Sequence, residues 1–307
     1  MKTLMKLFPL GLLILSGQAF GQAKEKYGDA RAMLIYPDDA EQVWILAASS
    51  TNIEYKDTIL SIDRERKARA SIDSIYFFEP PSFKAALSLF KGRDYSAARE
   101  AFAKVREEYK KIDDLPGNFS TLAGFYEIES ARKMMDFEGM AALLENFRPG
   151  SLVRETNKNQ LEIYSAWDAV RTKSWQRLIG MTDEMLAQKK WTGTQRAQIY
   201  YCRGMAHEGM EQPIKALNAF NATFTADYTA SEVLTKKAAL NCLRLIQNHD
   251  ETKLAIKLFG TEDENPNSTG SFLLQEAVAM CELWGVALGG GQPLPDEYKT
   301  FMKYKKN

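Results

Sequence analysis

The three cysteines are the residues whose spacing first suggests chemistry. Cys202, Cys242 and Cys281 lie 40 and 39 residues apart, and an exported chain can use cysteines for disulfides or metal binding. If they occupy successive parallel helices, the helix axes are about 8 to 10 Å apart, whereas a disulfide needs Cα atoms within about 7 Å. The odd count and the lack of nearby histidines also disfavour zinc. We therefore expect three buried small residues, with no metal and no cofactor.

Neither the histidines nor the carboxylates form a recognisable catalytic set. His207 and His249 lie 42 residues apart, and no Ser-His-Asp or Cys-His arrangement can be assembled from the spacing. Acidic residues are spread along the chain without a distinct glycosidase-like pair. The glycine run at 289–291 precedes a proline and lacks a following Lys-Ser/Thr, which indicates a flexible stop and not a phosphate loop. The sequence therefore predicts no catalytic residues and a protein that is not an enzyme.

Composition and charge indicate an ordinary globular chain. Hydrophobic residues make up 45% and charged residues 26% of the 307 residues, enough for a small module and an extended repeat array. The formal net charge is +0, which argues against a nucleic-acid-binding surface, because that needs a basic excess on one face. Short basic runs at 64–69 and 299–306 fit a solvated helix or a strand edge better than a membrane-surface or anion-binding patch.

Residues 1–21 have the layout of a secretory signal peptide. Lys2 and Lys6 precede an apolar run at 7–15, and small residues follow. We expect cleavage after Gly21 or Ala23. No cysteine lies near that point, which excludes a lipoprotein, and no later segment approaches the length of a transmembrane helix. The sequence thus predicts a soluble bacterial protein that is exported to the periplasm or the exterior.

Residues 22–41 read as a polar lead-in segment and residues 42–80 as a small β module. Four short stretches rich in β-branched and aromatic residues predict strands at 43–46, 52–55, 58–62 and 71–78. Their rhythm resembles a small curled antiparallel sheet of the SH3-like kind. Such a unit is too small to be independent, so we expect its apolar face to pack on the first helices that follow. Two prolines, Pro80 and Pro81, end the sheet.

Helical spacing of apolar residues then continues from 81 to 290 and predicts a run of helical pairs. Two helices are predicted between 82 and 105, with Ser82 as the cap of the first and a turn at 92–94 between them. The other predicted helices are 119–134 and 137–147, 156–171 and 175–188, two within 196–226, 231–248 and 251–259, and a last helix at 271–288. Residues 291–307 are expected to form a C-terminal tail.

The pair within 196–226 has the most informative spacing. Tyr200 and Gly204 lie on the first helix, and Ala216 and Phe220 lie on the second. Each helix therefore has one apolar stripe along its surface that it cannot bury alone. A glycine inside a helix costs about 1 kcal/mol relative to alanine, which predicts that the partner helix approaches closely at Gly204.

The order aromatic, Gly, Ala and Phe at Tyr200, Gly204, Ala216 and Phe220 resembles the tetratricopeptide repeat (TPR). A second match is found at Tyr95, Ala98 and Phe102. The equivalent aromatics Tyr95, Phe137 and Trp175 lie 42 and 38 residues apart, whereas the usual period is about 34 residues. We therefore expect a TPR-like array whose helices are a few residues longer than in the standard repeat.

The resemblance also implies a binding face. In tetratricopeptide-like arrays the first helix of each pair lines the concave face, where side chains from several repeats hold an extended peptide. Mapped onto this chain, the resemblance assigns partner binding to Phe125, Glu129, Arg132, Trp167, Arg171, Tyr201 and Glu208. The alternative interpretation is that Phe125 and Trp167 belong to the hydrophobic core.

The predicted fold is mainly α, with an α-solenoid of TPR-like helical hairpins preceded by a small antiparallel β module. The favoured function is that of a non-enzymatic scaffold or binding protein that holds a protein or peptide partner in the cell envelope. One alternative is an enzyme or enzyme accessory that acts on envelope polymers through paired carboxylates. Another is a self-assembling structural component whose β modules pair edge to edge.

Overall fold

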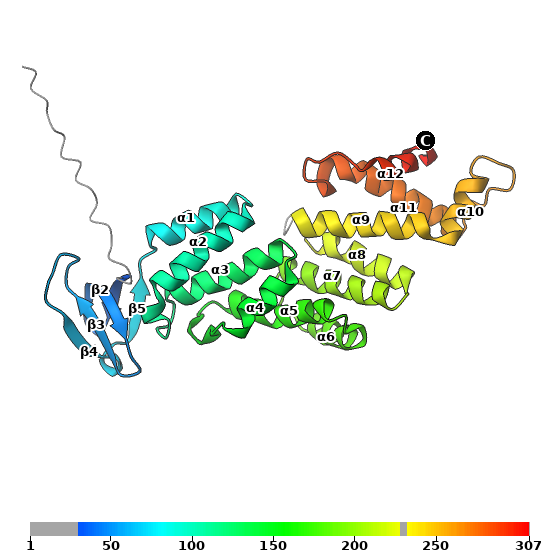
Figure 1. Ribbon diagram of the computed structural model, residues 1–307. Helices are drawn as coiled ribbons and strands as arrows, with labels where there is room; N and C mark the ends of the chain where they lie inside the picture. The colour runs from blue at the N-terminus through cyan, green and yellow to red at the C-terminus, as the bar shows by residue number, and fades with distance from the viewer. Residues whose placement is uncertain (1–29, 228–231, 307) are drawn as a thin grey trace, which may run out of the picture.

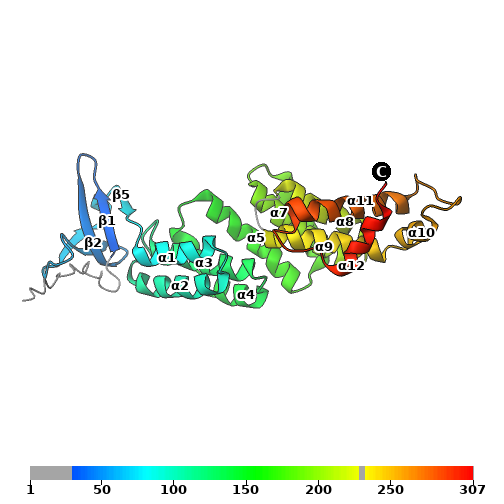
Figure 2. The same cartoon turned by 90° about the horizontal axis from the view of Figure 1, so that it is seen from above.

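The computed structural model describes residues 30–227 and 232–306, so the predicted signal peptide lies outside the described residues. This part of the chain is mainly helical, with a small antiparallel sheet at its N-terminal end. The molecule is elongated in both views, with the sheet at one end and the last helices at the other (Figure 1 and Figure 2). The predicted combination of a helical chain and a small N-terminal β module is therefore confirmed.

The sheet contains five strands. They are β1 (Ala30–Ile35), β2 (Ala40–Ala48), β3 (Asn52–Lys56), β4 (Glu65–Ala68) and β5 (Ser74–Phe77), in the spatial order β4-β3-β2-β1-β5. Every neighbouring pair is antiparallel. β1 to β4 form a meander, and β5 returns to pair with the other side of β1. β4 and β5 are therefore the two edges of the sheet.

The first strand was not predicted. β1 lies inside the segment 22–41, which was expected to be a polar lead-in. Its inward-facing residues include Ala30 and Ala32, and Leu34 is fully buried. Alanines give a weak alternation signal, because they contribute little to an apolar pattern even when they are buried. The sheet consequently begins twelve residues before the predicted start of the module at 42, at Ala30.

The stretch 58–62, predicted as a strand, is a turn followed by irregular chain. Leu60 and Ile62 are 79% and 93% exposed, so their apolar side chains gain nothing from a sheet. β-branched residues favour a strand only where a neighbouring strand and a buried face are available. The fourth strand instead comes from the basic run at 64–69, whose charged side chains protect an open edge.

Twelve α-helices follow in the described residues. They are α1 (Pro81–Lys91), α2 (Tyr95–Glu108), α3 (Phe119–Lys133), α4 (Phe137–Glu145), α5 (Glu155–Arg171), α6 (Trp175–Ala187), α7 (Gly193–Gly209), α8 (Pro213–Ala226), α9 (Glu232–Asn248), α10 (Asp250–Leu258), α11 (Thr269–Leu283) and α12 (Asp296–Lys299). The predicted helices are present with small shifts at their ends. α1 starts at Pro81, after Pro80 at the N-cap, and not after the predicted cap Ser82.

Four turns between paired helices share one backbone geometry. The central residue of each has a positive φ although it is not glycine, at Arg93 (68°), Met135 (60°), Lys173 (53°) and Glu211 (58°). In each turn this residue donates its N–H to the carbonyl three residues earlier, and the next residue donates to the carbonyl five residues earlier. These bonds close a helix end in the manner of a Schellman motif. The four residues are 42, 38 and 38 positions apart, so the turns repeat even where the sequence motif does not.

The hydrophobic core of the described residues has two main parts that meet at α3. One joins the inner face of the sheet to α1, α2 and the first half of α3. The other runs from Phe125 in α3 to Phe301. Leu122 and Tyr126 of α3 pack against both. The expectation that the β module packs on the first helices is confirmed.

Gly204 allows α7 and α8 to approach closely. A Cβ atom at this position would lie 2.6 Å from ring atoms of Phe220, well inside van der Waals contact. Phe220 is fully buried, as is Ala216 on the same helix. The close helix approach predicted at Gly204 is therefore confirmed.

The C-terminal segment predicted as a tail at 291–307 is largely folded. α12 and a 3-10 turn at Thr300–Tyr304 bury Tyr298 and Phe301 in the main core. No segment after the signal peptide was expected to be long enough to span a membrane. Thr269–Leu288, which comprises α11 and a π-helical turn, is nevertheless long and apolar enough to do so by length and composition. Its most apolar window is 50% buried, as in the core helix of a globular protein.

Candidate functional site

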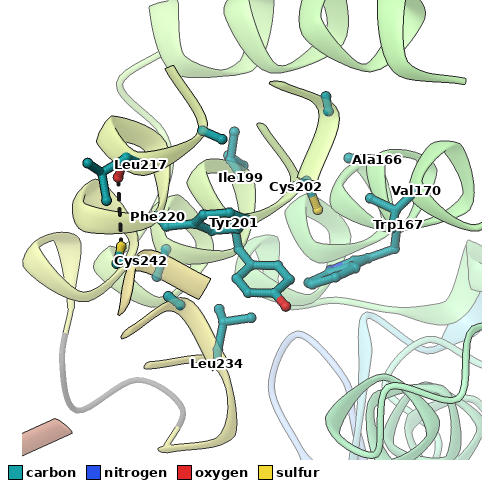
Figure 3. Close-up of a cluster of buried hydrophobic side chains, with 14 of the residues drawn as sticks. Ala166, Trp167, Val170, Ile199, Tyr201, Cys202, Leu217, Phe220, Leu234 and Cys242 are labelled. Carbon is teal, nitrogen blue, oxygen red and sulfur yellow. Dashed lines mark hydrogen bonds between the residues drawn. The ribbon is translucent and has the colours of Figure 1, made fainter. Parts of the chain in front are cut away.

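Most of the residues predicted to bind a partner are buried. Those with 8% exposure or less are Phe125, Glu129, Arg132, Trp167 and Tyr201. Trp167 and Tyr201 lie in the helix interface beside Phe220 and Cys202, with the two ring centroids 5.8 Å apart (Figure 3). The structure therefore supports the alternative that Phe125 and Trp167 belong to the core. These five side chains are not available to a partner on the surface.

Glu129 and Arg132 form a buried ion pair within α3. The Arg132 Nε and Nη2 atoms donate to the two carboxylate oxygens of Glu129 at 2.7 Å each, and the Tyr164 hydroxyl donates to Glu129 Oε1 at 2.7 Å. Burial alone raises the pKa of Glu129, but the charge of Arg132 and the hydrogen bonds outweigh it, so this pKa is lowered. The same environment raises the pKa of Tyr164 well above its usual value. The group is a satisfied structural network that ties α3 to α5.

A second buried polar group joins α5 to α7. Gln160 and Gln198 exchange side-chain hydrogen bonds of 2.9 and 3.0 Å, and the Trp167 indole donates to Gln198 Oε1 at 3.0 Å. Buried amides need such partners, because an unmet donor or acceptor costs about 1–3 kcal/mol. The interface between these helical pairs is therefore filled by matched side chains.

The remaining two predicted residues form surface ion pairs. Arg171 Nη2 lies 2.8 Å from Asp168 Oδ1, and its Nη1 lies 3.2 Å from Glu138 Oε2. Glu208 Oε1 lies 2.7 Å from Arg244 Nη2. Both predicted side chains are partly exposed, at 28% and 31%. Neither lines the pocket described below, so the seven predicted residues do not converge on one site.

The three cysteines are buried in α7, α9 and α11, as their spacing predicted. Burial raises the pKa of the Cys281 thiol to about 11, and it raises the pKa values of Cys202 and Cys242 further. Cys242 donates weakly to the Leu217 carbonyl at 3.8 Å (Figure 3). These thiols are protonated near neutral pH and are poor nucleophiles. Within 30–227 and 232–306, no group of three or more His, Cys, Asp or Glu residues is placed to hold a metal ion.

A pocket lies where the sheet meets the first helices. Its volume is about 660 Å³, within the range of about 300–1,000 Å³ that is usual for ligand sites. β5 and its flanking residues form one wall, α1 and α3 form another, and the chain leading into α5 closes a third side. The apolar part of the lining includes Phe77, Phe83, Leu87, Phe119, Leu122 and Tyr126. This junction differs from the interface between α5 and α7, which matched side chains fill.

One wall of the pocket is the open edge of β5. Phe78 donates its N–H to the Arg31 carbonyl of β1 at 3.0 Å. Antiparallel neighbours alternate between residues that bond across the pair and residues that do not. The backbone groups of Ser74 and Tyr76 therefore face β1. The N–H and C=O groups of Ile75 and Phe77 point away from β1. Both residues line the pocket.

Charged residues flank the apolar lining. Asp73 and Glu79 lie at the two ends of β5, and Arg154 lines the opposite side. These three side chains have no ion pair among the residues that the structure describes. Tyr126, between the walls, has its pKa raised, chiefly by burial, with Arg154 and Glu79 acting in opposite directions. The pocket thus combines an apolar floor with unpaired charges at its rim.

The pocket was not predicted from the sequence. It is made by residues that are distant in the chain, from Ile53 to Asn157. A local signal was present at every second position from 73 to 79, where Asp73, Ile75, Phe77 and Glu79 read acid, apolar, apolar, acid. Only the position of β5 at the sheet edge gives this alternation a meaning.

No protein-family model, no curated protein and no solved structure matches this chain. The resemblance to tetratricopeptide repeats therefore rests on the residues themselves, such as Gly204 and its contact with Phe220. The chemistry of the pocket lining is accordingly the guide to its ligand.

Proposed function

We propose that the protein is a non-enzymatic, exported binding protein that holds a peptide or a peptide segment of another protein. In this proposal the helical pairs form a TPR-like solenoid that serves as a rigid support. The binding site is the pocket between β5 and α1–α3. The observation that carries the proposal is a pocket of about 660 Å³ with a partly apolar lining and an open strand edge as one wall.

The chemistry of the lining favours binding over catalysis. Aromatic and aliphatic side chains supply contact area, and a few polar groups at the rim can fix the orientation of a ligand. An open strand edge offers backbone donors and acceptors, which bind a peptide irrespective of most of its side chains. These features together fit an extended polypeptide better than a small polar metabolite.

The repeated turns support the solenoid part of the proposal. Four successive pairs close with the same positive-φ turn, and each pair packs on the next along an elongated molecule (Figure 1 and Figure 2). In a solenoid each pair is completed by its neighbours, which keeps the array rigid over a long distance. The fifth pair departs from this geometry, since His249 between α9 and α10 has a φ of −72°.

Selection from a displayed random-peptide library on the full-length protein tests the proposed function. Val153 lines the pocket and is 57% exposed, so Val153→Trp blocks the mouth, whereas Ile62→Trp places the same side chain at a 93% exposed position outside the pocket. We expect Val153→Trp to raise the Kd of the selected peptides by about tenfold or more, and Ile62→Trp to leave this Kd unchanged. Peptides that bind both variants as tightly as the wild type, or a failure to select any peptide, would refute the proposal.

A further inference from the structure

We infer that the pocket takes an extended peptide that pairs antiparallel with β5 and carries the pattern basic-x-apolar-x-apolar-x-basic. This inference rests on the proposed function and specifies its ligand. Three features carry it: the outward backbone groups of β5, the face on which its side chains lie, and the charges at its ends.

The backbone sets the mode of binding. Ile75 and Phe77 each direct one N–H and one C=O away from β1, and no hydrogen bond from outside the sheet reaches these groups among the described residues. Just before the strand, Asp73 donates its N–H to the Ile35 carbonyl, so the free edge is confined to Ile75 and Phe77. A peptide strand of matching length satisfies both residues by adding to the edge, and the all-antiparallel sheet favours the same orientation for the added strand.

The side-chain direction sets the apolar positions. Phe77 is 7% exposed and Ile75 is half-buried, whereas Tyr76 between them is 60% exposed. Residues directly opposite in a sheet lie on the same face. Peptide residues opposite Ile75 and Phe77 therefore point toward the apolar lining, and the residue between them faces solvent beside Tyr76. The ligand needs two apolar residues separated by one other.

The acidic ends set the flanking charges. Asp73 lies just before β5, two positions before Ile75, and Glu79 lies just after it, two positions after Phe77, so one carboxylate flanks each end of the strand. Both carboxylates are exposed, line the pocket and have no ion pair among the described residues. Opposite charges across a strand pair stabilise it. Basic residues two positions before and two positions after the apolar pair bring a cation near each carboxylate.

The same charges disfavour a second copy of this chain as the occupant. A symmetric antiparallel pairing of two β5 strands that places Ile75 opposite Phe77 also brings Asp73 of each copy near Glu79 of the other. Like charges directly opposite each other destabilise a strand pair. The β5 edge is therefore suited to a basic peptide and not to edge-to-edge assembly with itself.

Three synthetic peptides test the pattern by fluorescence anisotropy with the full-length protein. The first is Lys-Thr-Ile-Thr-Val-Thr-Lys, the second is the same composition rearranged as Lys-Ile-Thr-Thr-Thr-Val-Lys, and the third replaces both lysines of the first by glutamate. We expect the first to bind most tightly. Two charge contacts predict a preference over the glutamate peptide of about 2- to 30-fold at low salt. Equal binding of the first and second peptides would overturn the inference.

Charge reversal on the protein provides the matched test. The double variant Asp73→Lys/Glu79→Lys is expected to prefer the glutamate peptide over the lysine peptide. The control Asp57→Lys/Asp63→Lys changes the net charge equally at exposed positions outside the pocket and is expected to keep the wild-type preference. An unchanged preference in the first variant would overturn the assigned register.

Ile75→Pro tests the backbone contact. It removes an N–H that points away from β1, so the existing sheet loses no hydrogen bond, and edge positions of this kind tolerate proline. We expect the affinity for the lysine peptide to fall by about tenfold or more, with an unchanged thermal melting curve. Full binding by a folded Ile75→Pro protein contradicts strand addition. If library peptides are still lost in Val153→Trp, the proposed function stands and only this inference fails. If the chain instead self-associates in sedimentation and Ile75→Pro dissociates it, a second copy is the occupant and the inference is wrong.

Discussion

The interfaces between helical pairs and the junction between the sheet and the helices are built from similar residues with different results. Between α5 and α7 the space is closed by Trp167 and by the reciprocal bonds of Gln160 and Gln198. Between β5 and α3 a comparable supply of aromatic residues leaves a pocket of about 660 Å³. Two packed helices such as α5 and α7 can interdigitate their side chains. A strand edge meeting the side of a helix has no such regular solution.

The two regions also differ in how their charges are used. Arg132 is 2% exposed and fully paired with Glu129, whereas Arg154 at the pocket rim is exposed and has no ion pair in the described part of the chain. The Glu129–Arg132 pair maintains the helical array, whereas Asp73, Glu79 and Arg154 around the pocket remain available to a ligand. Four sets of variants test how closely the helical array is packed and how its charges are used, beginning with the largest expected effect.

Arg132→Met should destabilise the protein by about 3–5 kcal/mol, because it leaves the Glu129 carboxylate buried without its partner. Arg154→Met, the same change at the pocket rim, should alter the free energy of unfolding by less than about 0.5 kcal/mol. Urea denaturation measures both. The double variant Glu129→Gln/Arg132→Met should recover much of the loss, since the amide still accepts from Tyr164. Equal costs for the two arginine variants would remove the distinction.

Gly204→Ala should destabilise by about 1–3 kcal/mol, because the added methyl group meets Phe220 in a filled interface. Gly180→Ala in α6 is the matched control, since a Cβ there meets nothing within 4 Å. It should stabilise by about 0.5–1 kcal/mol through helix propensity. Thermal melting of the two variants should therefore shift in opposite directions. A gain in stability for Gly204→Ala would show that the interface has room to spare.

Lys173→Gly should stabilise by about 0.5–1 kcal/mol, because glycine adopts the positive φ of 53° without steric cost. His249→Gly, in the link that lacks this geometry, should give no gain. The melting temperatures of the two variants compare the repeated turn with the irregular one. If both variants lose stability, the positive φ at Lys173 carries no strain.

The smallest expected effect is a pH dependence at His207. Its Nδ1 lies 3.0 Å from Gln212 Oε1, and burial is the main cause of its lowered pKa. The unfolded chain therefore binds a proton more readily, and stability should fall as the pH drops below about 6.5. His207→Asn should lose less stability than the wild type between about pH 7.5 and about pH 5.5. Parallel pH profiles of the two proteins would contradict this assignment.

Much of the helical architecture could be predicted from the sequence. Periodic apolar residues and breakers such as Gly92 and Pro149 located the helices, and Gly204 indicated the close approach of α7 and α8. β1 was not predicted because its buried residues include small alanines. Phe125 and Trp167 were assigned to both a binding face and the core, and burial decided for the core. Local spacing cannot tell which side of a helix a neighbour will cover.

The approximate positions of α1 to α11 follow from the sequence, because propensity, capping and periodicity are local properties of the chain. The sequence also determined the alternation of acid and apolar residues from Asp73 to Glu79. The edge position of β5, and the meeting of α1, α3 and the approach to α5 beside it, depend on contacts between distant parts of the chain. A pocket depends on which distant surfaces fail to fill the space between them, and that depends on packing in three dimensions.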